Sequence, residues 1–326
     1  MKKAVLFFLP LVALFNCTSS VGEGRLNADV FAEAKAAAYP LYTSSAYSFD
    51  GGIQALKNTI DAYGTFGELT TGLPVTIEGI VTIPSDYGFT VAGGVPSGSC
   101  SGYSPVIFGR SFVLQDQNTG ILVAYGQDPA LTTGSTTSQK YYLNAQVVNR
   151  AVFGDRLRIT VTHAQRYGDG TNSVALVKDF TDPAIVSSRN SVAYASQAGA
   201  FSRTTDLYRV RRLEGYILKS PAYVENDCSG GPYRFQYDHQ SGYAGELCVG
   251  TLSGTTCTGT VYAFKLSYNL GAGTLSGFDT GTSFSYNVGQ GARVRMTGPV
   301  FVPRFAGSDS YLMLMLSQKH QVETIQ

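Results

Sequence analysis

Four arginines alternate with apolar residues in two similar segments of the chain. The segments at 156–159 and 293–296 each read as arginine, apolar, arginine, apolar. In a β-strand this alternation places both arginines of a segment on one outward face. Guanidinium groups on such a face could bind a polyanion, whereas nearby acidic residues would make it an ordinary solvated surface. We treat all four as candidate ligand-binding residues: Arg156, Arg158, Arg293 and Arg295.

Tyrosines form a second group with the chemistry for binding. They gather in two stretches that also contain Gly, Ser and Pro, at 87–103 and 223–243. An exposed Tyr offers a large contact area at a low cost in conformational entropy, which suits a protein or glycan partner. The alternative is that the rings pack over the ends of β structure. Because long ordered loops in compact β domains usually serve binding, we name four candidates: Tyr87, Tyr103, Tyr233 and Tyr243.

Catalytic and metal-binding patterns have little support. Asp238 and His239 are adjacent, and adjacent residues in a strand point apart, so they make a poor general-base pair. The other histidines, His163 and His320, are far from them in the sequence, and no Cys-x-x-Cys occurs. The glycine pattern of a phosphate-binding loop is also missing from the sequence. We therefore expect a protein that is not an enzyme and that holds no metal or cofactor.

The amino terminus has the order of an export signal. Lys2 and Lys3 precede an apolar run at 4–15, which is shorter than the roughly 20 residues that a membrane-spanning helix needs. The tetrad Leu14-Phe15-Asn16-Cys17 resembles a bacterial lipobox, in the loose form found in spirochaete lipoproteins. This resemblance implies cleavage after residue 16 and acylation of Cys17, with lipid as a partner and the cell envelope, at its outer membrane, as the location. The alternative is an ordinary signal peptide with an incidental Cys.

Export would place the remaining cysteines in an oxidising compartment. They are even in number, which favours disulfides over metal ligation: Cys100, Cys228, Cys248 and Cys257. Three pairings are possible in principle. The pair Cys248 and Cys257 closes the shortest loop, which would leave Cys100 and Cys228 either paired with each other or free.

Composition limits the classes of protein further. The chain has 24 Lys and Arg against 23 Asp and Glu, a net charge of +1, which argues against a dedicated nucleic-acid binder. Its 44% of hydrophobic residues excludes disorder over the whole chain, and its 37 glycines indicate many turns. We expect a folded protein whose turns are built from Gly, Asn and Asp.

Two helices are expected before a long β region. Asn27 could cap a helix that ends at Ala38, before Pro40. Ile53, Leu56 and Ile60 have helical spacing and predict a second helix, ended by Gly64. From Thr71 onward, apolar and polar residues alternate between turn residues, which predicts strands to the end of the chain.

The β region contains two copies of one pattern. Glu78-Gly79 recurs as Glu214-Gly215, and Arg158 recurs as Arg295, at offsets of 136 and 137 positions. An Asp-x-x-(Ser/Thr)-Gly turn occurs at 116–120 and again at 238–242, and its offset of 122 predicts insertions in different loops of the two copies. Between 228 and 270 the second copy fits poorly, and we expect two extra strands near 261–268.

The order of these segments resembles the OB-like barrel of bacterial exported lipoproteins and nuclease-associated modules. The resemblance covers 71–186 well and 206–326 less well, and the alternative is a generic β-sandwich. It implies a mainly β fold of two tandem OB-like barrels after a short helical region. The expected organisation is a signal peptide at 1–16, a lipidated helical region at 17–70, barrels at 71–186 and 206–326, and a linker at 187–205.

These features favour a non-enzymatic, lipid-anchored envelope protein that acts as a binding or adhesion module. A protein or glycan is the expected ligand. One alternative is an accessory or degenerate domain of an exported nuclease or other hydrolase, and another is a structural envelope lipoprotein.

We predict that Cys17 is the first residue of the mature chain and carries acyl groups, because charge, apolar run and Cys follow in the order that processing requires. Mass spectrometry of the membrane-extracted protein measures this directly. A mature chain that begins elsewhere, or a Cys17→Ala variant that still partitions fully with membranes, would contradict it.

Overall fold

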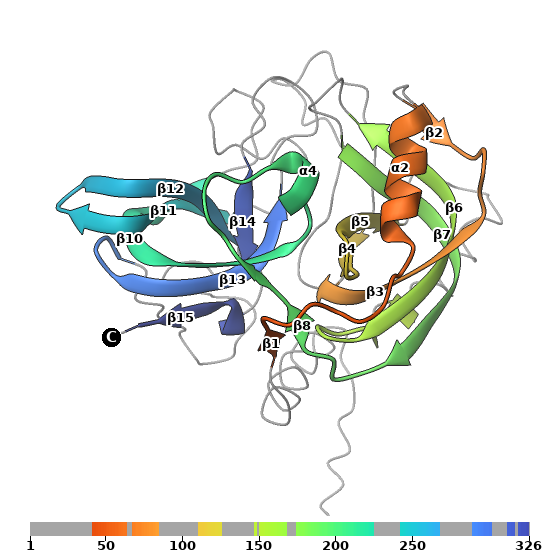
Figure 1. Cartoon of the computed structure of the whole chain (residues 1–326), viewed down its shortest axis with the longest axis horizontal. Coiled ribbons are helices and arrows are strands. Elements are labelled where there is room, and N and C mark those ends of the chain that lie inside the picture. Colours follow the sequence, from red (N-terminus) through yellow and green to blue (C-terminus); the bar gives the residue numbers. More distant parts are fainter. Residues whose placement is uncertain are drawn as a thin grey trace, which may run out of the picture.

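The computed structural model describes residues 41–63, 67–84, 110–125, 147–148, 150–167, 174–224, 242–267, 289–301, 312–316 and 319–325. The helix expected at 27–38 and Cys17 lie outside these residues, as do Cys100 and Cys228. The described part is mainly β, and Figure 1 shows two groups of strands side by side. No helix within the described ranges is long and apolar enough to cross a membrane.

The first group of strands forms a closed five-stranded barrel. Its strands are β3 (Val75–Ile83), β4 (Arg110–Gln115), β5 (Gly120–Tyr125), β6 (Arg156–Tyr167) and β7 (Val174–Ser187). Around the barrel the order is β3-β4-β5-β7-β6, and β6 pairs again with β3. Only β5 and β7 are parallel neighbours, and the other four pairs are antiparallel. The short strand β2 (Gly67–Leu69) extends β6 at the edge.

The second barrel repeats this order. Its strands are β10 (Val210–Val224), β11 (Gly242–Ser253), β12 (Thr256–Ser267), β13 (Arg293–Phe301) and β14 (Met313–Leu316). The ring runs β10-β11-β12-β14-β13 and closes through β13 and β10, again with one parallel pair, β12 and β14. A closed five-stranded Greek-key barrel of this kind is the OB fold. The predicted fold class, two tandem OB-like barrels, is confirmed.

The repeated residues lie in equivalent places. Glu78 on β3 is opposite Arg158 on β6, and Glu214 on β10 is opposite Arg295 on β13. The offsets in the sequence had predicted this correspondence. The repeated Asp-x-x-(Ser/Thr)-Gly turn was misinterpreted, because Gly120 begins the third strand of its barrel whereas Gly242 begins the second. The two extra strands expected near 261–268 are also wrong, since 256–267 is the regular third strand.

Short elements lie between and beside the barrels. They are β1 (Tyr42–Thr43), β8 (Val192–Ala193), β9 (Ala195–Ser196), α4 (Arg203–Asp206), the 3-10 turn η5 (Lys319–Gln321) and β15 (Val322–Thr324). The segment 187–205 was expected to be a simple linker. Within it, β8 pairs with β1, which lies before the first barrel, and β9 pairs with β10 of the second barrel.

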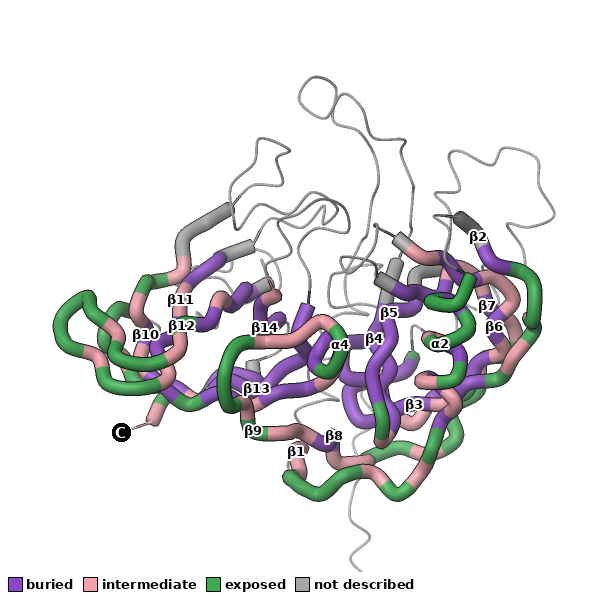
Figure 2. Tube along the Cα trace, turned by 45° about the horizontal axis from the view of Figure 1, so that its top comes forward, coloured by how far each residue is buried: buried purple, intermediate pink, exposed green. Residues whose placement is uncertain are grey.

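One helix, α2 (Ile53–Tyr63), closes the first barrel. Its buried residues Ile53, Leu56 and Ile60 belong to the same apolar cluster as core residues of β3 to β7. This confirms the second helix predicted from their spacing. A separate cluster, which includes Leu213, Phe264 and Met296, fills the second barrel. Figure 2 shows both cores as buried stretches along the strands.

The long hairpin of β11 and β12 carries a disulfide between Cys248 and Cys257. It is the pairing that closes the shortest loop among the predicted alternatives. The hairpin backbones approach closely at Gly250 and Gly259, where an added Cβ would lie 2.3 Å from a carbonyl oxygen of the opposite strand. Glycine at both positions therefore permits the close approach of the two strands, and the disulfide links them covalently.

The turn between β4 and β5 fixes the position of α2. The carboxylate of Asp116 is fully buried, and its Oδ2 accepts hydrogen bonds from the backbone N–H groups of Gly51 (3.1 Å) and Ile53 (3.3 Å). Its Oδ1 accepts from the backbone of Asn118 and Thr119, both at 2.9 Å. One side chain thus shapes its own turn and caps a helix that lies more than 60 positions earlier in the sequence.

We predict that Asp116→Ala lowers the free energy of unfolding by about 2 to 4 kcal/mol, because it leaves four backbone donors without their charged acceptor. Urea denaturation measures the change. Asp61→Ala, at an exposed position of the same helix, is the matched control and should change stability by less than about 0.5 kcal/mol. Equal effects of the two substitutions would contradict the capping role.

Candidate functional site

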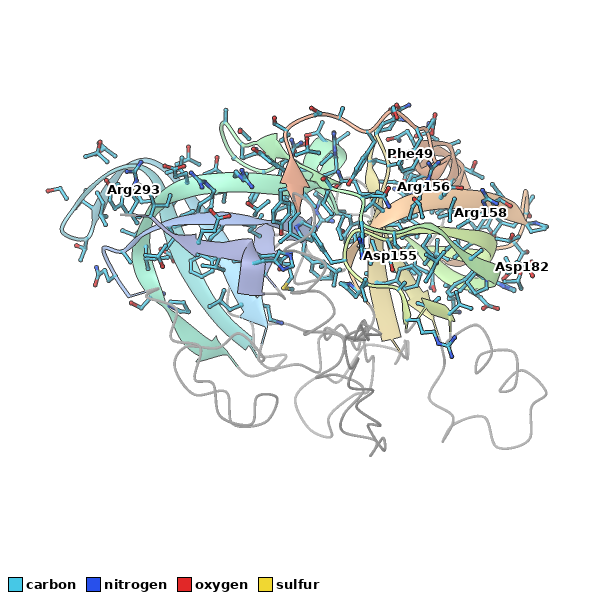
Figure 3. The ribbon with its side chains drawn as sticks, turned by 90° about the horizontal axis from the view of Figure 1, so that it is seen from below. Phe49, Asp155, Arg156, Arg158, Asp182 and Arg293 are labelled. Atoms are coloured by element: carbon cyan, nitrogen blue, oxygen red, sulfur yellow. A yellow bond between two sulfur atoms is a disulfide. The ribbon has the colours of Figure 1, made fainter. Side chains whose placement is uncertain are left out.

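The four candidate arginines form ion pairs with glutamates at equivalent places in both barrels. Arg156 and Arg158 both bind Glu78, the latter at 2.9 Å. Arg293 and Arg295 both bind Glu214, at 2.8 and 3.1 Å. Figure 3 shows Arg156 and Arg158 on one barrel and Arg293 far away on the other. The structure therefore brings each pair together but keeps the two pairs apart.

Acidic partners neutralise much of the charge of these clusters. Arg295 also binds Glu323 at 2.9 Å, and its hydrogen bonds to Glu323 and Glu214 raise the pKa of its guanidinium. Arg156 in addition lies over the ring of Phe49, 3.8 Å from the ring centre. Arg158 and Arg293 keep 51% and 45% of their side chains exposed, so solvent reaches them. Exposed ion pairs of this kind hold strand faces together only weakly.

The outer face of β4 and β5 is buried as well as the inner one. Phe112, Leu114 and Ile121 belong to the core cluster of the barrel. Val113 and Leu122 alternate with them, lie on the opposite face, and are 0% exposed. Figure 2 shows that the residues of β4 and β5 whose burial is described are buried. These two strands lie on the side of the first barrel that is nearest the second barrel. In OB folds the face of strands 2 and 3 is a common ligand surface, and in this barrel it is inaccessible.

The Tyr-bearing stretches occupy the same position in the two barrels. The connection between the first and second strands spans 84–109 in one barrel and 225–241 in the other. Tyr87, Tyr103 and Tyr233 belong to these connections and lie outside the described residues. Tyr243 is part of β11, where its backbone is opposite Tyr223, so it belongs to a strand end and not to the loop. In OB folds this connection is one of the ligand-binding loops.

The side chain of Gln115 connects the two barrels. Its Nε2 donates to the carbonyl of Ala193 (3.0 Å), and its Oε1 accepts from the backbone N–H of Val210 (2.7 Å), where β10 begins. Gln115 is only 3% exposed. Gln115 thus ties the start of the second barrel to the end of β4. The sequence did not predict this role of Gln115, because a single Gln at the end of a strand belongs to no recognisable motif.

Aromatic side chains also pack where the two barrels meet. Tyr42 packs edge-on against Phe153 with ring centres 5.4 Å apart, and His320 packs against Phe153 at 4.6 Å. The guanidinium of Arg212 lies 3.7 Å from the ring centre of Tyr194. Burial lowers the pKa of His320 to about 4. The sequence around His320 did not predict this contact.

The described residues do not form a metal-binding site. Across the part of the chain that the structure describes, no three His, Cys, Asp or Glu side chains gather closely enough to hold a metal ion. His163 lies near Asp179 (3.7 Å) on the first barrel, whereas His320 lies between the barrels. Asp238 and His239 lie outside the described residues.

Comparisons with known proteins add little to this geometry. Neither the known family models nor the curated proteins contain a match to the chain. Among solved structures, the single-stranded DNA binding protein from Thermus aquaticus is similar over 77% of this chain and 91% of its own, with 11% identity and a TM-score of 0.20. A likeness this weak carries no argument about function.

We predict that stability falls as the pH is lowered from 6.5 toward 4, and that part of this fall comes from His320. Its pKa is about 4 in the folded chain and about 6.5 when unfolded, so the unfolded state binds the proton first. The stabilising effect is complete above pH 6.5 and is lost toward the folded pKa. Urea denaturation at several pH values measures it. A His320→Leu variant should show a shallower dependence, and an unchanged slope would refute the assignment.

Proposed function

We propose that this chain is a non-enzymatic, lipid-anchored protein of the cell envelope that binds a protein or glycan partner. The binding surface in this proposal is formed by the Tyr-bearing connections of the two barrels. The observation that carries it is their shared position: both join strand 1 to strand 2 of an OB barrel. That connection commonly contributes to ligand binding in this fold, and here both are long and rich in Tyr.

Two further observations support loops over strand faces as the binding elements. The outer face of β4 and β5 is buried, so it offers no surface to a ligand. In each barrel the two arginines share one glutamate. Its negative charge reduces the attraction that the barrel face would exert on a polyanion. Both observations weaken the nuclease-accessory alternative, which would need an open basic groove.

The contact between the barrels supports a joint action of the two connections. Gln115 and the aromatic cluster fix one barrel against the other, so the strand ends that carry the connections are held at a fixed separation. Binding through two sites held at a fixed separation costs less entropy than binding through two independent ones. An acylated Cys17, as proposed from its lipobox, would hold this pair of barrels at the outer membrane.

The proposal is tested by comparing two multiple variants of the acylated protein. We predict that Tyr87→Ala, Tyr103→Ala and Tyr233→Ala, all in the two connections, together abolish binding to a glycan array or to purified envelope and host-surface proteins. The matched control replaces the ion-paired Arg156, Arg158, Arg293 and Arg295 by Ala, and it should bind like the parent protein. The Tyr side chains supply the contact area, whereas the arginines already have partners.

The other outcomes overturn the proposal in different ways. Loss of binding in the Arg variant alone, with a steep dependence on salt, would indicate a polyanion-binding barrel face. Unchanged binding in both variants would favour the structural lipoprotein. Circular dichroism of each variant checks that the barrels remain folded.

A further inference from the structure

Two cations, Lys57 and Arg209, belong to segments that touch where the barrels meet, and neither forms an ion pair with a residue that the structure describes. Lys57 on α2 is half-buried, and its ammonium donates to the Thr119 hydroxyl (2.9 Å) and to the carbonyl of Gly120 (3.3 Å), both uncharged. Arg209 precedes β10 and is also half-buried. Its backbone N–H donates to Asp206 and its carbonyl accepts from Val300. No residue that the structure describes gives its guanidinium a hydrogen bond or an ion pair.

A close backbone contact brings together the segments that carry these two side chains. Gly120, whose carbonyl binds Lys57, lies against Tyr208, the residue before Arg209. A Cβ added at Gly120 would be only 2.0 Å from the Tyr208 carbonyl oxygen. The turn that anchors Lys57 therefore touches the segment that carries Arg209. Burial lowers the pKa of Lys57 to about 8. The attraction of Asp61 and Asp116 opposes this shift, and repulsion from Arg209 adds a smaller lowering.

Two of the three neighbouring acids already have partners, and the third is exposed. Asp116 accepts four backbone hydrogen bonds, as described above. Asp206 binds Arg211 and accepts from the backbone N–H of Ser202 at 2.7 Å. Asp61 lies on the exposed side of α2. Burial, and then repulsion from Arg211, lower the pKa of Arg209, and the attraction of Asp206 and Asp116 opposes this shift. Partly buried positive charges without a counter-ion are costly, and an anion from solution would compensate them.

We propose that Lys57 and Arg209 form a binding site for a phosphate-like oxyanion at the junction of the two barrels, with Thr119 positioning Lys57. A guanidinium presents a fork of donors that matches two oxygens of such an anion, and an ammonium adds a compact charge. The site joins α2 of the first barrel to the segment that leads into the second. A bound oxyanion therefore also strengthens the contact between the barrels.

Calorimetry of the full chain with inorganic phosphate tests the site directly. We expect saturable binding that weakens at least about 10-fold in Lys57→Gln and in Arg209→Gln, because each removes one of two charge-assisted contacts. Lys219→Gln is the control, since Lys219 is 58% exposed on the second barrel. Affinity should fall as the pH rises above about 8, where Lys57 loses its proton. Sulfate at the same ionic strength should compete, and chloride should not.

A second measurement follows the protonation of Lys57, first without phosphate and then with it. NMR titration of the lysine side chains should show that Arg209→Gln raises the pKa of Lys57, because repulsion is removed, and that phosphate raises it in the parent chain. Glycerol phosphate replaces phosphate in a parallel experiment. Binding of both assigns the site to phosphate esters, and binding of phosphate alone assigns it to the free ion. The proposal is wrong if phosphate leaves the Lys57 titration unchanged, or if Lys219→Gln weakens binding as much as Lys57→Gln.

Discussion

The arrangement of the molecule depends on two neighbouring side chains at the end of β4. Successive residues of a strand point in opposite directions, so Gln115 and Asp116 can bind different parts of the chain. Gln115 holds the backbone at Ala193 and Val210, and Asp116 holds the start of α2. The adjoining Gly120 lets Tyr208 approach within backbone contact. One tight hairpin thus fixes the helix, the first barrel and the start of the second barrel relative to each other.

The repeated Glu and Arg residues have a structural explanation that differs from their first interpretation. In each barrel the first and fourth strands are antiparallel, and their pairing places one Glu directly opposite one Arg. A second Arg, two residues earlier on the fourth strand, reaches the same carboxylate. Cross-strand ion pairs of this type favour the correct register. The repetition therefore reflects shared strand pairing in two copies of a fold, and it gives no evidence of a shared ligand.

Patterns local in the sequence predicted much of the fold. Helix α2 followed from the spacing of Ile53, Leu56 and Ile60, and the Cys248–Cys257 disulfide agreed with the preference for the shortest loop. The features that the sequence did not reveal join residues far apart. The hydrogen bond from Val210 to Gln115 spans 95 positions, and Lys57 is 62 positions from Thr119. Such contacts leave no periodic pattern. Asp116 illustrates the limit: its turn was predicted, whereas its second role as a helix cap depends on tertiary contact.

Backbone strain at the junction indicates how firmly its geometry is imposed. Tyr208 is fully buried and has a φ of +64°, a conformation that costs a residue with a bulky side chain about 1 to 3 kcal/mol. Three contacts impose it: its N–H donates to Val300 (2.7 Å), its ring packs on Phe301, and its carbonyl lies against Gly120. Two of these contacts come from β13 of the second barrel and the third from the start of β5 in the first barrel, so Tyr208 is held between the two barrels. The next residue is Arg209, and the contacts that hold Tyr208 therefore also hold the backbone of Arg209 near the turn that anchors Lys57. A chain selected for stability alone would be expected to carry a pair of opposite charges, or apolar residues, at such a contact.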